Sequence, residues 1–128
     1  MDYLTDTHPL VWYFMEDERL SLKASNAFEE TLKEGLILVP TIVLAELMYI
    51  AQKGKTVLTF AETLTRLEMY ENFEIVPLDV DVLKTADTIS VDLEMHDRLI
   101  VATALFSGVP LITKDETIAS AKVVETIW

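Results

Sequence analysis

The chain has 128 residues, of which 51% are hydrophobic, and this length suits one domain that buries roughly two-thirds of its unfolded surface. Its formal net charge of −12 disfavours general affinity for nucleic acid, but still allows a nucleic-acid enzyme with a divalent cation in its site. The absence of cysteine excludes disulfides, thiolate catalysis and cysteine-based zinc sites, and two histidines are too few for an imidazole-rich metal cage.

No stretch of the sequence reads as a linker, a repeat or a membrane span. Asp2 and Asp6 interrupt any apolar run of the kind that a signal peptide needs. We therefore expect a single domain over residues 1–128, located in the cytoplasm and not in a membrane.

The chain opens with a short predicted strand that delivers Asp6 at its carboxyl end. Pro9 suits the first position of the helix that follows. A second helix, capped by Ser21 and ended by Gly35, is expected to bury Leu22 on its apolar stripe.

Glu46 stands in a helix that has no polar face. Residues 36–39 form a continuous apolar run, typical of a strand covered on both faces in a parallel sheet. Thr41 is placed to cap the next helix, over residues 42–52, where Glu46 is the single charge. A buried glutamate needs a partner, and the neighbouring sequence offers none.

The middle of the chain continues the alternation of helices and strands. We expect a helix over residues 57–69, a strand over 73–78 and a helix over 82–93. Asp79 and Asp81, which precede the last of these, are interpreted as capping or solvated groups.

Asp97 is a carboxylate on the inward face of a predicted helix over residues 96–105, which Gly108 ends. It is either a helix cap, because it lies near the first turn, or a ligand of a cation. A short strand over residues 111–113 then delivers Asp115 at its carboxyl end, and residues 123–128 close the chain as an edge strand. Together these elements predict a three-layer α/β/α domain with a mostly parallel central sheet.

Four misplaced carboxylates point to one pocket. Ligands of open parallel sheets bind beyond the carboxyl ends of the strands, where Asp6 and Asp115 are expected, and Glu46 and Asp97 lie in helices connected to those strands. Such like charges need a cation, and an all-oxygen ligand set favours Mg²⁺ or Mn²⁺. The expected chemistry is metal-assisted hydrolysis of a phosphate ester.

These residues occur in motifs that resemble the PIN-domain ribonucleases, particularly the VapC-type toxins of toxin-antitoxin pairs. The motifs are Asp6-Thr7-His8 with Trp12, Leu44-Ala45-Glu46-Leu47, His96-Asp97-Arg98-Leu99-Ile100 and Ile112-Thr113-Lys114-Asp115. The resemblance implies a PIN fold, Mg²⁺- or Mn²⁺-dependent endoribonuclease activity on RNA, and inhibition by a small cognate antitoxin.

The resemblance also assigns site residues. Asp6, Glu46, Asp97 and Asp115 match the acidic quartet, which would hold one or two metals directly or through water, and Thr113 matches a hydroxyl beside it. One of the four would orient or deprotonate the attacking water, and the sequence does not distinguish which.

Other polar residues of these motifs have two interpretations. Thr7, His8, Arg98 and Lys114 are candidates for contact with the scissile phosphate or the RNA strand, and each is equally well explained as surface or cap chemistry. His96 is interpreted as structural.

Aromatic residues in the predicted helices raise the question of a partner surface. Two interpretations are open for these side chains: they line a homodimer interface or antitoxin groove, or they fill the core. The residues concerned are Trp12, Phe14, Tyr49 and Phe60.

Two other functions remain as alternatives. Another Mg²⁺-dependent phosphohydrolase would usually carry a second aspartate two positions after its nucleophilic one, where this chain has His8. A catalytically silent PIN-like module for metal binding or protein interaction is the other, and the presence of all four acids disfavours it.

Overall fold

The computed structural model of residues 1–128 contains five strands and seven helices. The strands are β1 (Tyr3–Thr5), β2 (Ile37–Pro40), β3 (Phe73–Val76), β4 (Leu111–Ile112) and β5 (Thr126–Ile127). The helices are α1 (Thr7–Phe14), α2 (Leu22–Glu34), α3 (Thr41–Gln52), α4 (Phe60–Glu68), α5 (Val80–Asp87), α6 (Met95–Ser107) and α7 (Glu116–Ala121).

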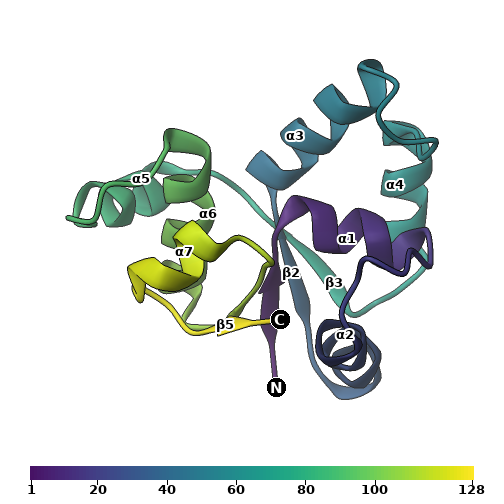
Figure 1. Ribbon diagram of the computed structural model, residues 1–128, viewed down its shortest axis with the longest axis horizontal. Coiled ribbons are helices and arrows are strands. Elements are labelled where there is room, and N and C mark those ends of the chain that lie inside the picture. Colours follow the sequence, from purple (N-terminus) through teal and green to yellow (C-terminus); the bar gives the residue numbers. More distant parts are fainter.

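The strands form one parallel sheet in the order β3-β2-β1-β4-β5. Helices α1 to α4 lie on one side of the sheet, and α5 to α7 lie on the other (Figure 1). The chain moves outward from β1 through β2 to β3, then crosses back to β4 and β5, so strand order reverses between β1 and β4. This arrangement confirms the predicted α/β class, and the sheet is parallel throughout.

The core lies on both faces of this sheet. Leu4, Val39 and Leu111 from three adjacent strands are fully buried, and Phe28 from α2 and Ile100 from α6 cover them from opposite sides. The apolar residues of β2 are all buried, which explains why its sequence shows no alternation. None of the helices combines the length and apolar character that crossing a bilayer requires.

Two predicted caps differ from the structure. The Asp6 carboxylate accepts from the Thr7 N–H, so α1 begins at Thr7 and Pro9 occupies its third position, not the first. Thr41 is the first residue of α3 and does not cap it, because its hydroxyl accepts instead from the Leu78 N–H at 3.1 Å. The tie to Leu78 joins the start of α3 to the segment after β3.

Two helices are shorter than predicted. The helix expected over 57–69 begins at Phe60, because the Thr59 hydroxyl accepts from the Glu62 N–H and caps it there. The helix expected over 82–93 begins at Val80, where Asp79 caps it as predicted, and ends at Asp87.

The predicted limits of two other helices are confirmed. Ser21 caps α2, although Leu22 is 78% exposed and lies off the buried stripe. Gly108 ends α6 with φ of 70°, in the left-handed region that glycine adopts without strain.

Candidate active site

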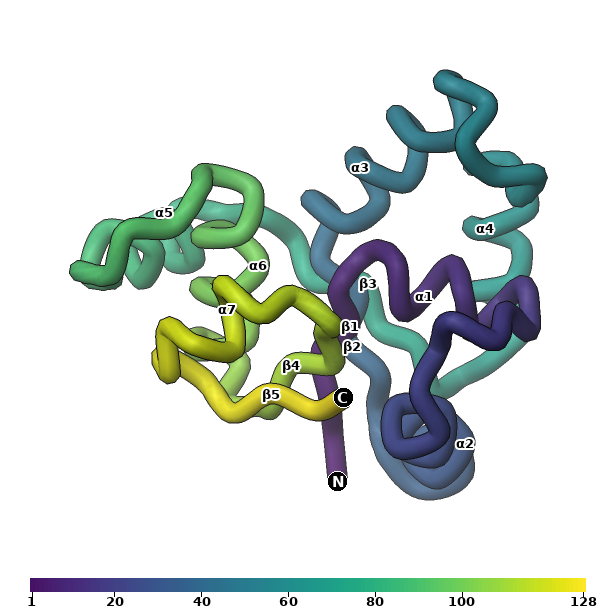
Figure 2. The backbone as a smooth tube through the Cα atoms, in the orientation of Figure 1, coloured from purple at the N-terminus to yellow at the C-terminus, as the bar shows by residue number.

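Asp6 and Thr113 meet at the point where strand order reverses. In the parallel pairing of β1 with β4, Thr5 lies opposite Ile112, so the next residue of each strand emerges at the same edge. The Asp6 N–H donates to the Ile112 carbonyl at 3.0 Å, which continues the ladder by one step. Figure 2 shows the segment between β4 and α7 passing close to the end of β1, where α1 begins. This is the edge where open parallel sheets bind ligands.

The Thr113 hydroxyl connects two of the carboxylate residues. It donates to Asp6 Oδ2 at 2.7 Å and accepts from the Asp115 N–H at 3.1 Å. The other oxygen of Asp6 accepts from the Thr7 N–H at 2.7 Å, and Asp115 Oδ1 caps α7 by accepting from the Ile118 N–H at 3.0 Å. Thr113 itself is 2% exposed, so a buried hydroxyl fixes the side chain of Asp6 and the backbone of Asp115, whose own carboxylate is fixed by the Ile118 N–H.

Asp97 faces the same edge from the first turn of α6 and is half-buried. Burial raises the pKa of its carboxyl group to about 6, and repulsion from Asp115 and Asp6 adds to the shift. Burial likewise raises the pKa of Asp6, against the hydrogen bonds from Thr113 and Thr7, which lower it. Three carboxylates therefore repel one another here, and no lysine or arginine side chain forms an ion pair with any of them.

Glu46 acquires its missing partner from a distant part of the chain. On α3 it forms an ion pair with His96 Nε2 of α6, and the two side chains are 25% and 28% exposed. Burial alone would raise the pKa of Glu46, but the hydrogen bond and charge of His96 hold it below its usual value. The same contact raises the pKa of His96.

The four acids are thus gathered at one edge of the sheet, from β1, α3, α6 and the β4–α7 connection. Glu46 raises the pKa of Asp6 through its charge, as Asp6 and Asp115 do for Asp97. In their present positions, however, no three of these carboxylate and imidazole groups converge tightly enough to enclose a metal ion.

The remaining predicted residues differ in their positions. Thr7 is fully buried beside Glu46, and its hydroxyl has no hydrogen-bond partner of normal geometry. His8 and Lys114 line a cavity of about 490 Å³ together with Asp6 and Asp115. Two of the candidate RNA contacts, His8 and Lys114, therefore lie beside two of the carboxylates.

Arg98 lies apart from this cavity. Its guanidinium donates to the carbonyls of Ile89 at 2.6 Å and Val91 at 2.9 Å, in the loop between α5 and α6. We therefore assign it a structural role that ties this loop to α6.

Comparisons with known proteins agree with this geometry. The sequence matches the family model of the PIN domain over residues 3–124, nearly the whole chain. The chain belongs to the PIN domain family. It is 31% identical over 119 residues to Ribonuclease VapC22 of Mycobacterium tuberculosis. The aligned residues cover 91% of this chain and 89% of that protein. This level of similarity over most of both chains makes it a VapC-type PIN domain.

Solved structures show the same fold at lower identity. VapBC2 from Rickettsia felis, bound to a DNA fragment from its promoter, superposes with a TM-score of 0.73 and 19% identity over 98% of this PIN domain and 97% of that chain. VapC20 of Mycobacterium tuberculosis, a Sarcin-Ricin loop cleaving toxin, gives a TM-score of 0.69 and 14% identity over 96% and 97% of the two chains.

Sequence reasoning missed two features of this PIN domain. One is the His96–Glu46 pair, and the available signal was that a buried glutamate without a local partner needs a distant one. The other is Arg19, which lines the cavity of Asp6 and Asp115 although it comes from the polar loop between α1 and α2. Its position depends on how that loop folds back, which no local sequence pattern predicts.

Proposed function

We propose that this PIN domain is a divalent-metal-dependent endoribonuclease that hydrolyses phosphodiester bonds of RNA. The observation that carries the proposal is the joining of Asp6 and Asp115 through Thr113, with Asp97 facing them and no cationic side chain paired to any of the three. The similarity to a protein named a ribonuclease supports the same activity.

The donor set fits a hard, oxygen-binding cation that keeps part of its water shell. Asp6, Asp97 and Asp115 offer only carboxylate oxygens, and their mutual repulsion is relieved by positive charge. Mg²⁺ in particular is held by one or two carboxylates together with waters and substrate phosphate, so it does not require three side chains to enclose it. Mg²⁺ or Mn²⁺, when bound, would act as a Lewis acid towards the phosphate and lower the pKa of a water.

The chain's own residues divide the remaining work. Asp6 and Asp115, fixed by Thr113, suit the role of holding the cation. Asp97 faces these two residues from α6 without a hydrogen bond from the backbone, and suits the acceptance of a proton from the attacking water. Glu46, held by His96, would contribute to holding the cation, and Thr7 lies beside Glu46 as a support of its position.

We further propose that the protein is the toxin of a toxin-antitoxin pair, inhibited by a small antitoxin, and that it forms a homodimer. Its structural relatives include VapBC complexes, and apolar side chains are exposed on α3 and α5, among them Tyr49 at 56% and Leu83 at 47%. Of the two interpretations of the aromatic residues, the core applies to Trp12 and Phe14, and an exposed surface applies to Tyr49. Trp12 and Phe14 are buried at 8% and 7% exposure, and Phe60 packs partly against the core.

The direct test is RNA cleavage by the purified full chain in the presence of Mn²⁺. We expect fragments from a total cellular RNA pool, no fragments with EDTA, and no fragments from the Asp6→Asn variant. Intact RNA after incubation with the wild-type protein and either metal would refute the proposal.

A further inference from the structure

The ring of Trp12 is covered by cationic side chains from two segments far apart in the sequence. The guanidinium carbon of Arg19 lies 5.1 Å from the ring centroid, and Lys114 Nζ lies 5.8 Å from it, both within cation-π distance. The rings of His8 and Trp128 pack against Trp12 at centroid distances of 5.7 Å and 5.9 Å. The buried indole thus brings two positive charges together on one surface.

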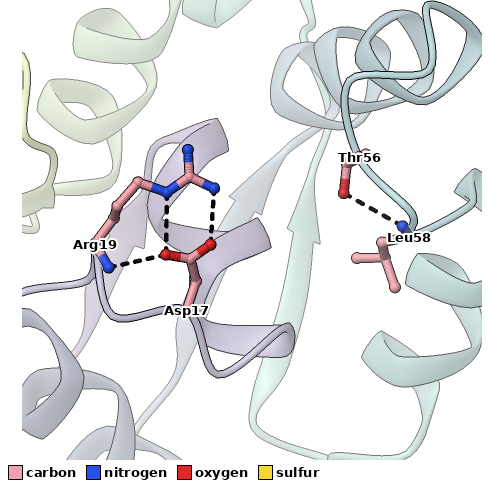
Figure 3. Close-up of polar contacts among 4 residues, drawn as sticks. All are labelled: Asp17, Arg19, Thr56 and Leu58. Carbon is pink, nitrogen blue, oxygen red and sulfur yellow. Dashed lines mark hydrogen bonds and ion pairs between the residues drawn. The ribbon is translucent and has the colours of Figure 1, made fainter.

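The position of Arg19 is fixed by its own loop. Its Nε and one terminal nitrogen donate to the two carboxylate oxygens of Asp17 at 3.0 Å and 2.7 Å, and its backbone N–H donates to Asp17 as well. Figure 3 shows the other terminal nitrogen pointing away from Asp17, with no contact drawn to it. This arrangement holds the guanidinium in place and leaves donors for a further anion.

Lys114 is exposed and forms no ion pair, although the chain has more than twice as many acidic as basic residues. The other two arginines are occupied elsewhere, since Arg66 donates to the Phe14 carbonyl and Arg98 donates to the α5–α6 loop. Arg19 and Lys114 share the 490 Å³ cavity with Asp6, Asp115 and Glu116. Positive charge and the proposed catalytic carboxylates therefore border the same space.

We propose that Arg19 and Lys114, supported by Trp12, bind a phosphate of the RNA strand next to the phosphate that is cleaved. This inference rests on the proposed ribonuclease function. Guanidinium and ammonium groups form charge-assisted hydrogen bonds with phosphate, and the aromatic ring beneath them offsets their mutual repulsion. On a chain of net charge −12, Arg19 and Lys114 are the lysine and arginine side chains that line the cavity of Asp6 and Asp115, so they are the groups there that attract a phosphate.

The test is RNA binding by full-length variants in an Asp6→Asn background, which removes cleavage under the proposed function. Fluorescence anisotropy with a labelled single-stranded RNA of mixed sequence gives the affinity at several salt concentrations in Mn²⁺. We expect Arg19→Gln and Lys114→Gln each to weaken binding about 10-fold and to reduce the slope of log affinity against log salt by about 0.7, the value for one phosphate contact.

The matched control is Lys23→Gln. It makes the same charge change at an exposed position on α2 that does not line the cavity of Asp6 and Asp115. Its affinity and salt slope are expected to equal those of the Asp6→Asn parent. Thermal melts of all variants show whether the fold is retained.

Two results would overturn the inference. Either the parent binds no RNA, or Arg19→Gln and Lys114→Gln match Lys23→Gln in affinity and slope. If wild-type protein still cleaves RNA in either case, the ribonuclease function stands and only the phosphate subsite is refuted.

Discussion

The two sides of the acidic site are built by different means. Asp6 and Asp115 follow strands of the sheet, and each accepts a backbone N–H while sharing the buried Thr113 hydroxyl. Glu46 and Asp97 project from helices, and neither carboxylate accepts a hydrogen bond from the backbone. Glu46 is held by the charge of His96, and Asp97 by packing alone against repulsion from its neighbours.

Backbone hydrogen bonds fix the geometry of the first side, formed by Asp6 and Asp115. The geometry of the second side, formed by Glu46 and Asp97, depends on charge. On the first side, a substitution of similar shape preserves the fold and removes only the chemistry. On the second side, a change of charge or of pH alters the stability of the metal-free protein.

The largest expected effect is that of Asp6→Asn on activity. Asparagine keeps the shape of the side chain and its cap of α1, but it removes a negative oxygen from the proposed cation site. We expect the RNA cleavage rate to fall by roughly two to three orders of magnitude, the usual loss when one group is removed from a site of charge development. Cleavage kinetics and a thermal melt of the same preparation check this, and a melt far below the wild type would contradict our view of the backbone-fixed side.

Thr113→Val sharpens the comparison by removing the hydroxyl that links Asp6 to Asp115. We expect cleavage to fall about 10- to 100-fold, as for other groups that orient metal ligands. Stability should fall by about 1–2 kcal/mol, because the Asp115 N–H loses its acceptor. Thr103→Val is the control in chemical denaturation and cleavage assays, since its buried hydroxyl donates only to the Leu99 carbonyl of its own helix. Equal activity of both variants would remove Thr113 from the site.

Asp97→Asn tests the charge-dependent side through pH. The carboxyl pKa of Asp97 is raised from 3.8 to about 6, so the folded protein binds more protons than the unfolded chain between these values. The unfavourable contribution of Asp97 to stability in EDTA should therefore diminish as the pH falls from 7 through 6 towards 4. At pH 7 we expect Asp97→Asn to be more stable than the wild type by about 1 kcal/mol after solvent screening, and the difference to vanish below pH 4. Urea unfolding at several pH values measures this, and a variant less stable at pH 7 would contradict it.

His96→Gln has the smallest expected effect on stability, and it should destabilise the protein, whereas Asp97→Asn should stabilise it. The pKa of His96 is raised, so its contribution is present below 6.5 and lost as the pH rises through the folded value. The pKa of Glu46 is lowered, so its contribution is present above 4.5 and lost as the pH falls through the folded value. We expect the variant to lose about 0.5 kcal/mol between pH 4.5 and 6.5 in EDTA, and less at pH 8. A loss that does not vary with pH would show that packing, and not charge, joins α3 to α6.

Sequence reasoning succeeded where local patterns determine structure. Continuous apolar runs located β2 and β4, Ser21 and Gly108 marked helix ends, and the carboxylates at the ends of strands were placed by topology. The four acids were predicted together because Glu46 and Asp97 are charges on apolar helix faces, and because Asp6 and Asp115 follow strands whose carboxyl ends share one edge.

It failed where distant groups compete for a side chain. Thr41 is a residue type that commonly caps helices, but its hydroxyl accepts a hydrogen bond from the distant Leu78 N–H instead. For Arg98 the sequence left an RNA contact and a surface or cap role open, and in the structure carbonyls of the α5–α6 loop accept its donors. These partners lie beyond the window in which periodicity or capping is read, so only the folded arrangement identifies them.

The hydrogen bond between Thr113 and Asp6 joins residues 107 positions apart in the chain. The central strand β1 likewise gains its second neighbour only when β4 pairs with it. Contacts of such long range form late, because loop closure must precede them. During synthesis, a ribosome-bound chain that lacks its last segment holds Asp6 without Thr113 or Asp115. The acidic site of this PIN domain is therefore complete only after the chain has extended through Asp115 and β4 has paired with β1.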